Sequence, residues 1–432
     1  METQDFKKIL TNKVDNAICL WWFNVDQDTE WDQSEKSFLP RVMPDNKSMI
    51  YGMEQMLLMV ACADDYVILR EMPESTVIEN IKQIRKELPK IIILEGCKES
   101  DSISDFIMSD SNMIQFIVDL AKNNDVYLVP YAVYSAEIKL AELTGTTLVG
   151  PKLRLAQWVN SKINSRHISK ELGFCISEGY ECRSLCDVEN AIDSLCTHKK
   201  DTNIVVKEPY GSSGKGFLKI KNSADISLIK YLANKKEKKK ETFNVLLEKW
   251  YENKTDINYQ FFISDNEISK IIISYQFVMD GVYRGTKVIS DEDDPIIAIV
   301  DKVIIEIGEF LRTKGYRGVC SIDALYVNNE IFIPIIEING RFSLSSYISC
   351  LECLNDRCVV SQYYDFPSEI TIECVQEHLI KHNIVYDKNN REGVLIYSFS
   401  YGNTKNRMFV LNIFPQNDNS YEKINSIISE LQ

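Results

Sequence analysis

The sequence lacks several features that would assign it to a membrane, secreted or nucleic-acid-binding class. No apolar run approaches the roughly 20 residues that a membrane-spanning helix needs. The first residues, Met1–Lys8, lack the charged-then-apolar layout of a signal peptide. Basic residues are in the minority, since 49 Lys and Arg against 63 Asp and Glu give a net charge of −14, which argues against a nucleic-acid partner. We therefore expect a cytoplasmic protein that binds neither nucleic acid nor membrane.

Metal and redox motifs built on cysteine and histidine are also scarce. The chain has 12 cysteines but only 4 histidines, and the histidines stand singly or away from the cysteines. Cys350-x-x-Cys353, with Cys358 and Cys374 downstream, allows a zinc site, but no second tight pair completes it. Without a secretion signal, reduced thiols that are part of the core or incidental are the simpler interpretation.

The chain does contain a glycine loop between two β-type runs. The first run ends at Lys207, the loop spans Gly211 to Gly216, and the second run is Phe217–Ile220. Too few residues separate the glycines for a Walker loop, and no helix follows, as a dinucleotide fingerprint would require. Glycines nevertheless allow a tight turn that presents backbone N–H groups to an anion. A phosphate loop and a plain hairpin turn both remain open at this point.

The most informative stretch is the apolar run that carries Glu337, Asn339 and Arg341. Side chains at i, i+2 and i+4 project from the same side of a strand. Together with Asp323 from a neighbouring strand, the carboxylate and amide oxygens form the kind of site that Mg²⁺ prefers. Arg341 adds a donor for a phosphate or carboxylate oxygen. The alternative is an exposed strand face with a chance salt bridge.

A third feature is an acid-aromatic turn between two β-type runs. The first run ends at Glu248-Lys249-Trp250, and a second, alternating run begins at Asp256. Such a turn could present backbone groups to an adenine edge and an acid to a ribose hydroxyl. Alone, it is equally compatible with an ordinary strand-loop-strand.

In this order and spacing, the pieces resemble the ATP-grasp superfamily over roughly residues 151–365. The resemblance implies that Lys162 and Lys207 are the two phosphate-contacting lysines and that Asp256 contacts the ribose. It implies that Glu248 lies near the adenine amino group, beside the backbone of Lys249 and Trp250. The loop that closes over the phosphates would comprise Gly211, Ser212, Ser213, Gly214 and Gly216, and the magnesium ligands would be Asp323, Glu337 and Asn339. The implied cofactors are ATP and Mg²⁺, with two ions that Mn²⁺ can replace.

One position departs from the superfamily pattern. Several of its small-molecule ligases carry an arginine two residues before the first metal-binding acid, where this chain has Ser321. The charge that steadies the acyl-phosphate oxygen must then come from elsewhere. Arg341 and Arg284 are the catalytic candidates, although Arg284 also fits a solvated hairpin residue.

The length predicts more than one domain, since single cores stop growing near roughly 250–300 residues. Strands and helices alternate over 1–150, which favours a parallel sheet, and this part resembles the domain that precedes ATP-grasp modules in natural-product peptide ligases. We expect a two-lobed ATP-grasp domain over 151–365, with a lid lobe at about 174–247, and a small α+β cap domain over 366–432. The predicted fold class is α/β (α+β).

The resemblance implies a ligase that activates an amino acid or peptide carboxylate as an acyl phosphate and forms an amide bond, in natural-product biosynthesis. A close alternative loads an amino acid such as glutamate onto the thiol of an acyl carrier protein. The net negative charge disfavours an acidic carrier, whereas the basic run Lys235–Lys240, interpreted as a solvated loop, could dock one. A third possibility is a phosphotransferase or a biotin-dependent carboxylase component, of which the carboxylase is disfavoured because no biotinyl-lysine module is visible. A non-catalytic nucleotide-binding regulator is the alternative of another class, and a homodimer is common among related ligases.

Overall fold

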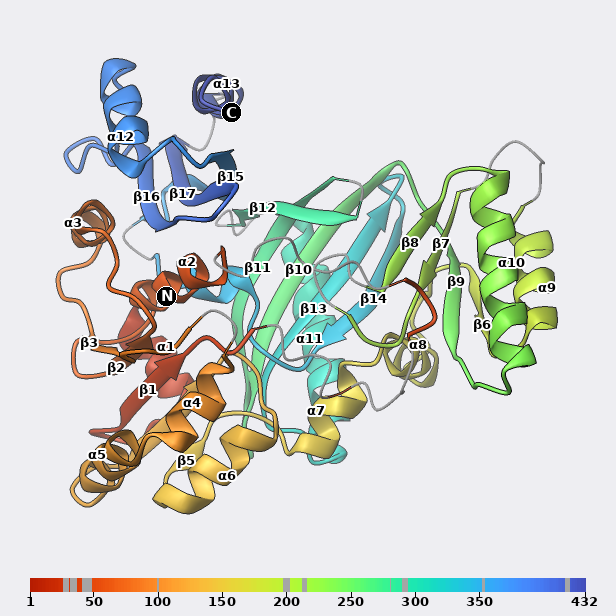
Figure 1. Ribbon diagram of the computed structural model, residues 1–432, viewed down its shortest axis with the longest axis horizontal. Coiled ribbons are helices and arrows are strands. Elements are labelled where there is room, and N and C mark those ends of the chain that lie inside the picture. Colours follow the sequence, from red (N-terminus) through yellow and green to blue (C-terminus); the bar gives the residue numbers. More distant parts are fainter. Residues whose placement is uncertain are drawn as a thin grey trace.

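A computed structural model gives the structure of the chain (Figure 1). It describes residues 1–25, 31, 37–40, 49–98, 101–196, 203–211, 216–279, 281–289, 294–351, 354–415 and 420–432. Among them, no helix combines the length and apolar character that crossing a membrane requires. The mixed α/β class predicted from the sequence is confirmed, because one parallel sheet and two antiparallel sheets are surrounded by helices.

The amino-terminal part forms the predicted parallel sheet, with strand order β3-β2-β1-β4-β5. Its strands are β1 (Ile18–Trp22), β2 (Tyr66–Leu69), β3 (Lys90–Ile93), β4 (Val126–Pro130) and β5 (Thr147–Leu148). The helices of this part are α1 (Thr3–Leu10), α2 (Met49–Glu54), η2 (Gln55–Met59), α3 (Ser75–Ile84), α4 (Ile103–Ser109), α5 (Ser111–Ala121) and α6 (Ser135–Thr144). Alternate residues of β1 enter two cores, Trp21 on one face and Trp22 on the other. This two-sided burial explains why the strand is apolar throughout.

The central sheet has eight antiparallel strands in the order β14-β13-β10-β11-β12-β15-β17-β16. Its strands are β10 (Lys254–Ile263), β11 (Ile268–Met279), β12 (Val282–Val288), β13 (Gly318–Val327), β14 (Ile331–Asn339), β15 (Arg357–Pro367), β16 (Gly393–Ser400) and β17 (Lys405–Pro415). Helix α11 (Pro295–Thr313) packs its apolar face against this sheet, as its periodicity predicts. The predicted boundary at 365/366 falls inside β15, and the two carboxyl-terminal strands continue the same sheet.

A smaller sheet at the far side of the molecule lies within the predicted lid lobe, and we refer to this part as the lid (Figure 1). Its order is β6-β9-β7-β8, from β6 (Gly179–Cys182), β7 (Ile204–Lys207), β8 (Phe217–Ile220) and β9 (Val245–Lys249). Helices α9 (Leu185–Leu195) and α10 (Ser223–Lys238) cover it. The interpretation of Lys235–Lys240 as a loop is wrong, because Lys235 to Lys238 form the last turn of α10. Cations at a helix C-terminus interact favourably with its dipole.

The remaining helices connect or close these sheets. The segment from Leu153 to Leu172, which the sequence predicts as one helix, is interrupted and gives α7 (Leu153–Val159) and α8 (Lys162–Glu171), and η3 (Leu344–Ile348) follows β14. Helices α12 (Ile372–Lys381) and α13 (Ser420–Ser429) pack near the carboxyl-terminal strands. Of the cysteines considered for zinc, Cys350 and Cys358 are buried and Cys374 is exposed. Cys353 lies outside the described residues.

Candidate active site

The candidate site is a cleft between the lid and the central sheet. Its lining comes from the three parts of the chain: Tyr131 follows β4, Lys207 ends β7, and Asp323 and Glu337 lie on β13 and β14. The predicted residues that line it are Lys162, Lys207, Gly211, Lys249, Trp250, Asp256, Asp323, Glu337, Asn339 and Arg341. Ser212, Ser213 and Gly214 lie outside the described residues. Their roles, like those of the other site residues, remain predictions.

The candidate magnesium ligands are brought together by strand register. Asp323 pairs directly with Glu337 across β13 and β14, and Ser321 pairs with Asn339. The amide of Asn339 donates to Asp323 Oδ2 at 3.2 Å, which leaves its carbonyl oxygen free to accept or to ligate. Asn258 on β10 donates to Asp323 Oδ1 at 2.9 Å. Two carboxylates and an amide oxygen therefore converge, and this donor set fits Mg²⁺.

The carboxylates of Asp323 and Glu337 repel each other when both are ionised and no cation lies between them. Burial, and then the neighbouring Glu337 carboxylate, raise the pKa of Asp323 to about 6. Lys162 partly offsets the charge, since its Nζ contacts Glu337 Oε1 at 2.8 Å and the Gly211 carbonyl at 2.8 Å. Lys162 thus joins the base of the glycine loop to the candidate metal ligands. A divalent cation would remove the main repulsion.

We expect Asp323→Asn to stabilise the metal-free protein increasingly as the pH rises from about 4 to about 6. Because the pKa of Asp323 in the folded protein lies above its ordinary value of 3.8, ionisation of Asp323 opposes folding fully above about pH 6 and not below about pH 4. After discounting for its partial contact with solvent, the gain at pH 7.5 is on the order of 2 kcal/mol. Denaturant unfolding of wild type and variant at pH 4 and 7.5 measures it. The surface variant Asp301→Asn is the control, and a difference that does not change with pH would contradict the prediction.

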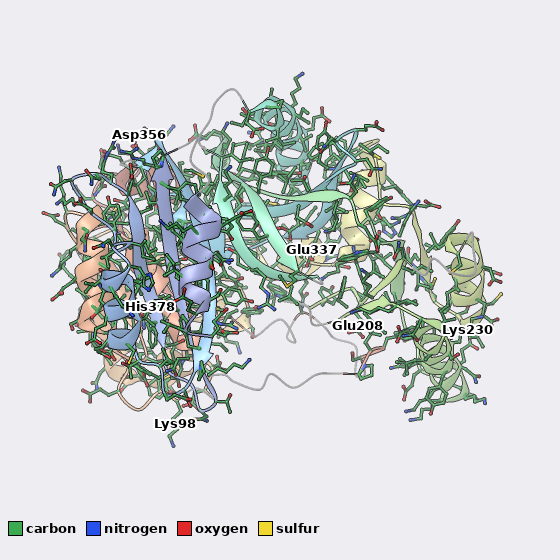
Figure 2. All side chains as sticks on the ribbon, turned by 90° about the horizontal axis from the view of Figure 1, so that it is seen from above. Lys98, Glu208, Lys230, Glu337, Asp356 and His378 are labelled. Carbon is green, nitrogen blue, oxygen red and sulfur yellow. The ribbon has the colours of Figure 1, made fainter. Side chains whose placement is uncertain are left out.

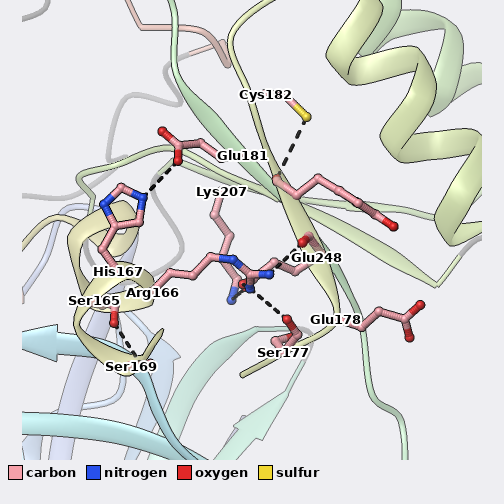
Figure 3. A network of polar contacts seen from close by, with 12 residues as sticks. Ser165, Arg166, His167, Ser169, Ser177, Glu178, Glu181, Cys182, Lys207 and Glu248 are labelled. Carbon is pink, nitrogen blue, oxygen red and sulfur yellow. Dashed lines mark hydrogen bonds and ion pairs between the residues drawn. The ribbon is translucent and has the colours of Figure 1, made fainter. Parts of the chain in front are cut away.

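Lys207 is held by a buried ion-pair network that Figure 3 shows. Glu248 accepts from Arg166 at Oε1 (2.9 Å) and from Lys207 at Oε2 (2.8 Å), and it is only 5% exposed. Arg166 also donates to the carbonyls of Ser177 (2.7 Å) and Gly179 (2.6 Å), so it connects α8 to the lid. Glu248 is not among the residues that line the cleft, whereas Lys249 and Trp250 are. The geometry therefore makes Glu248 a support for Lys207, and its contact with adenine stays a prediction.

The sequence contained a signal for Arg166 that the motif comparison missed. Lys162 and Arg166 are four residues apart on α8, so they share one face of the helix. That face points toward the cleft and the lid. An arginine one turn after a predicted phosphate-binding lysine therefore predicts a second cation in the same network.

Lys207→Ala is expected to weaken ATP binding far more than the substitution of its charged neighbour Lys249. A charge-assisted hydrogen bond contributes about 1.5–3 kcal/mol, so KM for ATP should rise about 10- to 100-fold. Lys249→Ala is the matched control, because the Lys249 ammonium pairs with the exposed acid Glu178 at 3.3 Å. Initial rates of ADP release over a range of ATP concentrations measure both. Unchanged ATP affinity in Lys207→Ala would overturn the role assigned to this lysine.

The proposed nucleotide side of the cleft is aromatic and positively charged. The Trp250 ring meets Phe217 edge-on, with ring centroids 5.7 Å apart. The ammonium groups of Lys219 and Lys254 lie 4.7 and 4.9 Å from the centre of the Trp250 ring. Lys254 also pairs with Asp256 at 2.5 Å, and burial raises the pKa of Asp256. Asp256 is thus positioned on the lining that the ribose contact would need.

The structure separates the two candidate arginines. Arg341 lines the cleft, where its Nη1 donates to the Tyr131 hydroxyl at 2.6 Å. Arg284 is not among the lining residues, and its Nη1 donates to the Tyr363 hydroxyl at 3.0 Å. Neighbouring residues of a strand face opposite sides, and Tyr283, next to Arg284 on β12, does line the cleft. Arg341 is therefore the better-placed candidate for the acyl-phosphate oxygen.

A buried polar network beneath the candidate metal ligands was not foreseen from the sequence. Asn258 donates to the Ser321 hydroxyl at 2.9 Å, and Gln260 donates to the hydroxyls of Ser343 (2.7 Å) and Ser345 (2.6 Å). The position where related ligases carry an arginine thus holds a small hydrogen-bonded hydroxyl. Single serines and amides on strands carry little local signal, so only the fold reveals the network.

Comparison with known proteins gives one informative sequence relative. No protein-family model matches the chain. The chain is 30% identical over 331 residues to the [butirosin acyl-carrier protein]–L-glutamate ligase of Niallia circulans, covering 76% of this chain and 73% of that protein. Identity at this level over most of both chains shows that the two proteins belong to one family.

Two solved structures share the fold at low sequence identity. The L-amino acid ligase from Bacillus licheniformis has a TM-score of 0.53 with 10% identity, over 96% of this chain and 98% of that one. The biotin carboxylase domain dimer of Hydrogenobacter thermophilus 2-oxoglutarate carboxylase, in complex with MgADP, has a TM-score of 0.53 with 13% identity, over 96% and 90%. The sequence relative and the shared fold together show that the protein belongs to the ATP-grasp carboxylate ligases and is an ATP-dependent ligase.

Proposed function

We propose that this ligase uses ATP and Mg²⁺ to activate the carboxylate of an amino acid as an acyl phosphate, and that it transfers the acyl group to the thiol of an acyl carrier protein. The convergence of Asp323, Glu337 and Asn339 opposite Lys162 and Lys207 supports the activation step. The carrier-protein glutamate ligase that is 30% identical over 331 residues supports the acceptor. The MgADP complex of a protein with this fold supports the cofactors.

The chemistry explains why such a site is needed. A carboxylate is a poor electrophile because its leaving group would be oxide. Attack of a carboxylate oxygen on the γ-phosphorus releases ADP and forms an acyl phosphate, from which phosphate can leave. The thiol sulfur then attacks the carbonyl carbon, phosphate departs and the thiol proton is lost to solvent or to a base. Magnesium, which Asp323, Glu337 and Asn339 would hold, would offset the charge of the phosphates when bound.

The side chains of the cleft would act through charge and position. Asp323, Glu337 and Asn339 would hold the metal ion, and Lys162 and Lys207 would neutralise the phosphates. Arg341 would steady the acyl-phosphate oxygen in place of an arginine at position 321. Each contact is most effective where water is excluded and the donors are already fixed.

Amide formation with an amine is the second candidate, and the charge of the chain favours it. A net charge of −14 opposes docking of an acidic carrier. The exposed end of α10, which carries Lys235, Lys238, Lys239 and Lys240, offers a local basic surface that could offset this repulsion. The two candidates therefore differ in the nucleophile and share the activation step.

One assay series separates these outcomes. The protein is incubated with Mg-ATP and pooled amino acids, with and without hydroxylamine, and ADP and hydroxamates are measured. A trapped hydroxamate that depends on one amino acid would support acyl-phosphate formation. Mass spectrometry after addition of holo carrier protein or of amines then identifies the acceptor. ADP release that needs no carboxylate would contradict the activation step.

Three further assignments are part of this proposal. The units are 1–150, 151–365 and 366–432, with the lid lobe at about 174–247. We place the protein in the cytoplasm, supported by free thiols at all described cysteines. The homodimer expected from related ligases stays a prediction that analytical ultracentrifugation can test.

A further inference from the structure

A short segment between β1 and α2 contacts the lid instead of the amino-terminal sheet. Phe38 and Leu39 are only 5% and 6% exposed, and they belong to the hydrophobic core of the lid. The Phe38 ring contacts the Phe243 ring with a centroid distance of 4.9 Å. Two apolar side chains that precede the lid by more than a hundred positions are therefore part of its core.

The same segment binds the residue that follows Lys207. Glu208 Oε1 accepts from the Ser37 hydroxyl (2.7 Å), the Phe38 N–H (2.5 Å) and the Leu39 N–H (3.0 Å). Three donors on one carboxylate oxygen make a charge-assisted and directional contact. Figure 2 shows Glu208 at the side of the lid that faces the rest of the molecule.

Glu208 also closes the base of the glycine loop. Its N–H donates to the Gly216 carbonyl at 2.8 Å. Gly216 has a φ of +71°, and a Cβ there would lie 2.7 Å from the Tyr210 carbonyl oxygen and 3.1 Å from Glu208 Oε2. The Gly216 end of the loop is thus packed against Glu208, which the 37–39 segment holds in place.

Residues shortly before this segment contact the amino-terminal unit and the cleft. The Trp31 ring stacks on Tyr134 at 4.7 Å, and its Nε1 donates to the Val133 carbonyl at 3.3 Å. Val25 lines the cleft, as do Tyr131 and Arg341. Described residues that follow β1 therefore contact three places. Val25 lines the cleft, Trp31 packs on the amino-terminal unit, and Ser37 to Leu39 bind Glu208 at the base of the glycine loop.

We propose that Ser37, Phe38 and Leu39 form a positioning element for the phosphate-binding side of the cleft. By holding Glu208, they fix the end of β7, where Lys207 lies, and the base of the loop before ATP binds. Fixing these groups in advance reduces the ordering that ATP binding would otherwise require. The inference does not depend on which nucleophile accepts the acyl group.

The direct test removes the apolar contact in the full-length protein with Phe38→Ala/Leu39→Ala. The affinity for Mg-AMP-PNP, measured by calorimetry, should fall about tenfold, and KM for ATP should rise about tenfold. We expect kcat to change less than about threefold. The conservative pair Phe38→Leu/Leu39→Met should restore the affinity. Ile229→Ala is the matched control, because Ile229 is 0% exposed in the same lid core but lies on α10. Equal loss of affinity in that control would overturn the proposal in favour of general lid stability.

A second variant keeps the test valid if the double alanine protein folds poorly. Glu208→Ala leaves the apolar core of the lid intact and should weaken Mg-AMP-PNP binding to a similar extent. If Glu208→Ala and Phe38→Ala/Leu39→Ala act through one contact, the combined variant should bind Mg-AMP-PNP little more weakly than either variant alone. Unchanged affinity in Glu208→Ala, or fully additive losses, would contradict the proposal. Nucleotide binding is measured without carboxylate or acceptor, so a wrong assignment of the ligated substrates would not alter this result.

Discussion

Glu337→Gln should reduce ADP formation by about two to three orders of magnitude or more while the protein remains folded. Glutamine keeps the shape of the side chain but loses the charge that would hold a divalent cation and that receives Lys162 Nζ at 2.8 Å. Two supports of the site are thus lost together, one for the metal ion and one for the lysine. Asp323→Asn should act similarly, because Asp323 faces Glu337 directly across the strand pair.

The measurement is ADP release at saturating ATP over a range of magnesium concentrations, with circular dichroism as the check on folding. Glu330→Gln is the matched control, since Glu330 is exposed in the turn between β13 and β14. We expect the control to keep wild-type turnover. Near-normal turnover of Glu337→Gln at low magnesium would show that the metal ligands lie elsewhere.

The parts of the fold that follow from local patterns could be predicted from the sequence. Strand β1 is apolar on both faces because it is buried on both, and the alternation of strands with helices over 1–150 predicted the parallel sheet. Alternation placed Glu337 and Asn339 on one face of β14, Arg341 lies two residues after the end of that strand, and all three line the cleft. The split between α7 and α8 has no local pattern, and the contacts at the break come from a distant segment, since the Asn160 side chain accepts from the Gly340 N–H at 3.1 Å.

The site residues that were not predicted act through contacts between distant segments. Arg166 reaches Glu248, and Glu208 receives its three donors from Ser37–Leu39, so neither role has a local pattern. The motif assigned Glu248 to the adenine, whereas in the structure its two carboxylate oxygens accept from the side chains of Arg166 and Lys207. Motif order can indicate which segments form a cleft, whereas the partners of each buried charge depend on how those segments pack.

Arg341→Met should lower kcat for ligation about 100- to 1,000-fold, whereas Arg284→Met should keep it within about threefold of wild type. Arg341 is held in the cleft by the Tyr131 hydroxyl, and its guanidinium carbon lies 5.1 Å from the centre of the Tyr131 ring. Arg284 packs instead 5.6 Å from the centre of the Tyr363 ring, outside the lining of the cleft. The two variants remove the same charge, one inside the lining of the cleft and one outside it, so each serves as the control for the other.

The comparison is made on amino-acid-dependent hydroxamate formation together with ADP release. Arg341→Lys should recover only part of the rate, because a lysine keeps the charge but cannot form the paired hydrogen bonds of a guanidinium. If Arg284→Met loses as much hydroxamate as Arg341→Met, the acyl-phosphate charge must develop on the Tyr363 side. If neither variant loses activity, the charge missing at Ser321 must be supplied by a residue outside this pair. The expected result, loss with Arg341 alone, would make the arginine that follows β14 the functional substitute for the one missing at Ser321 on β13.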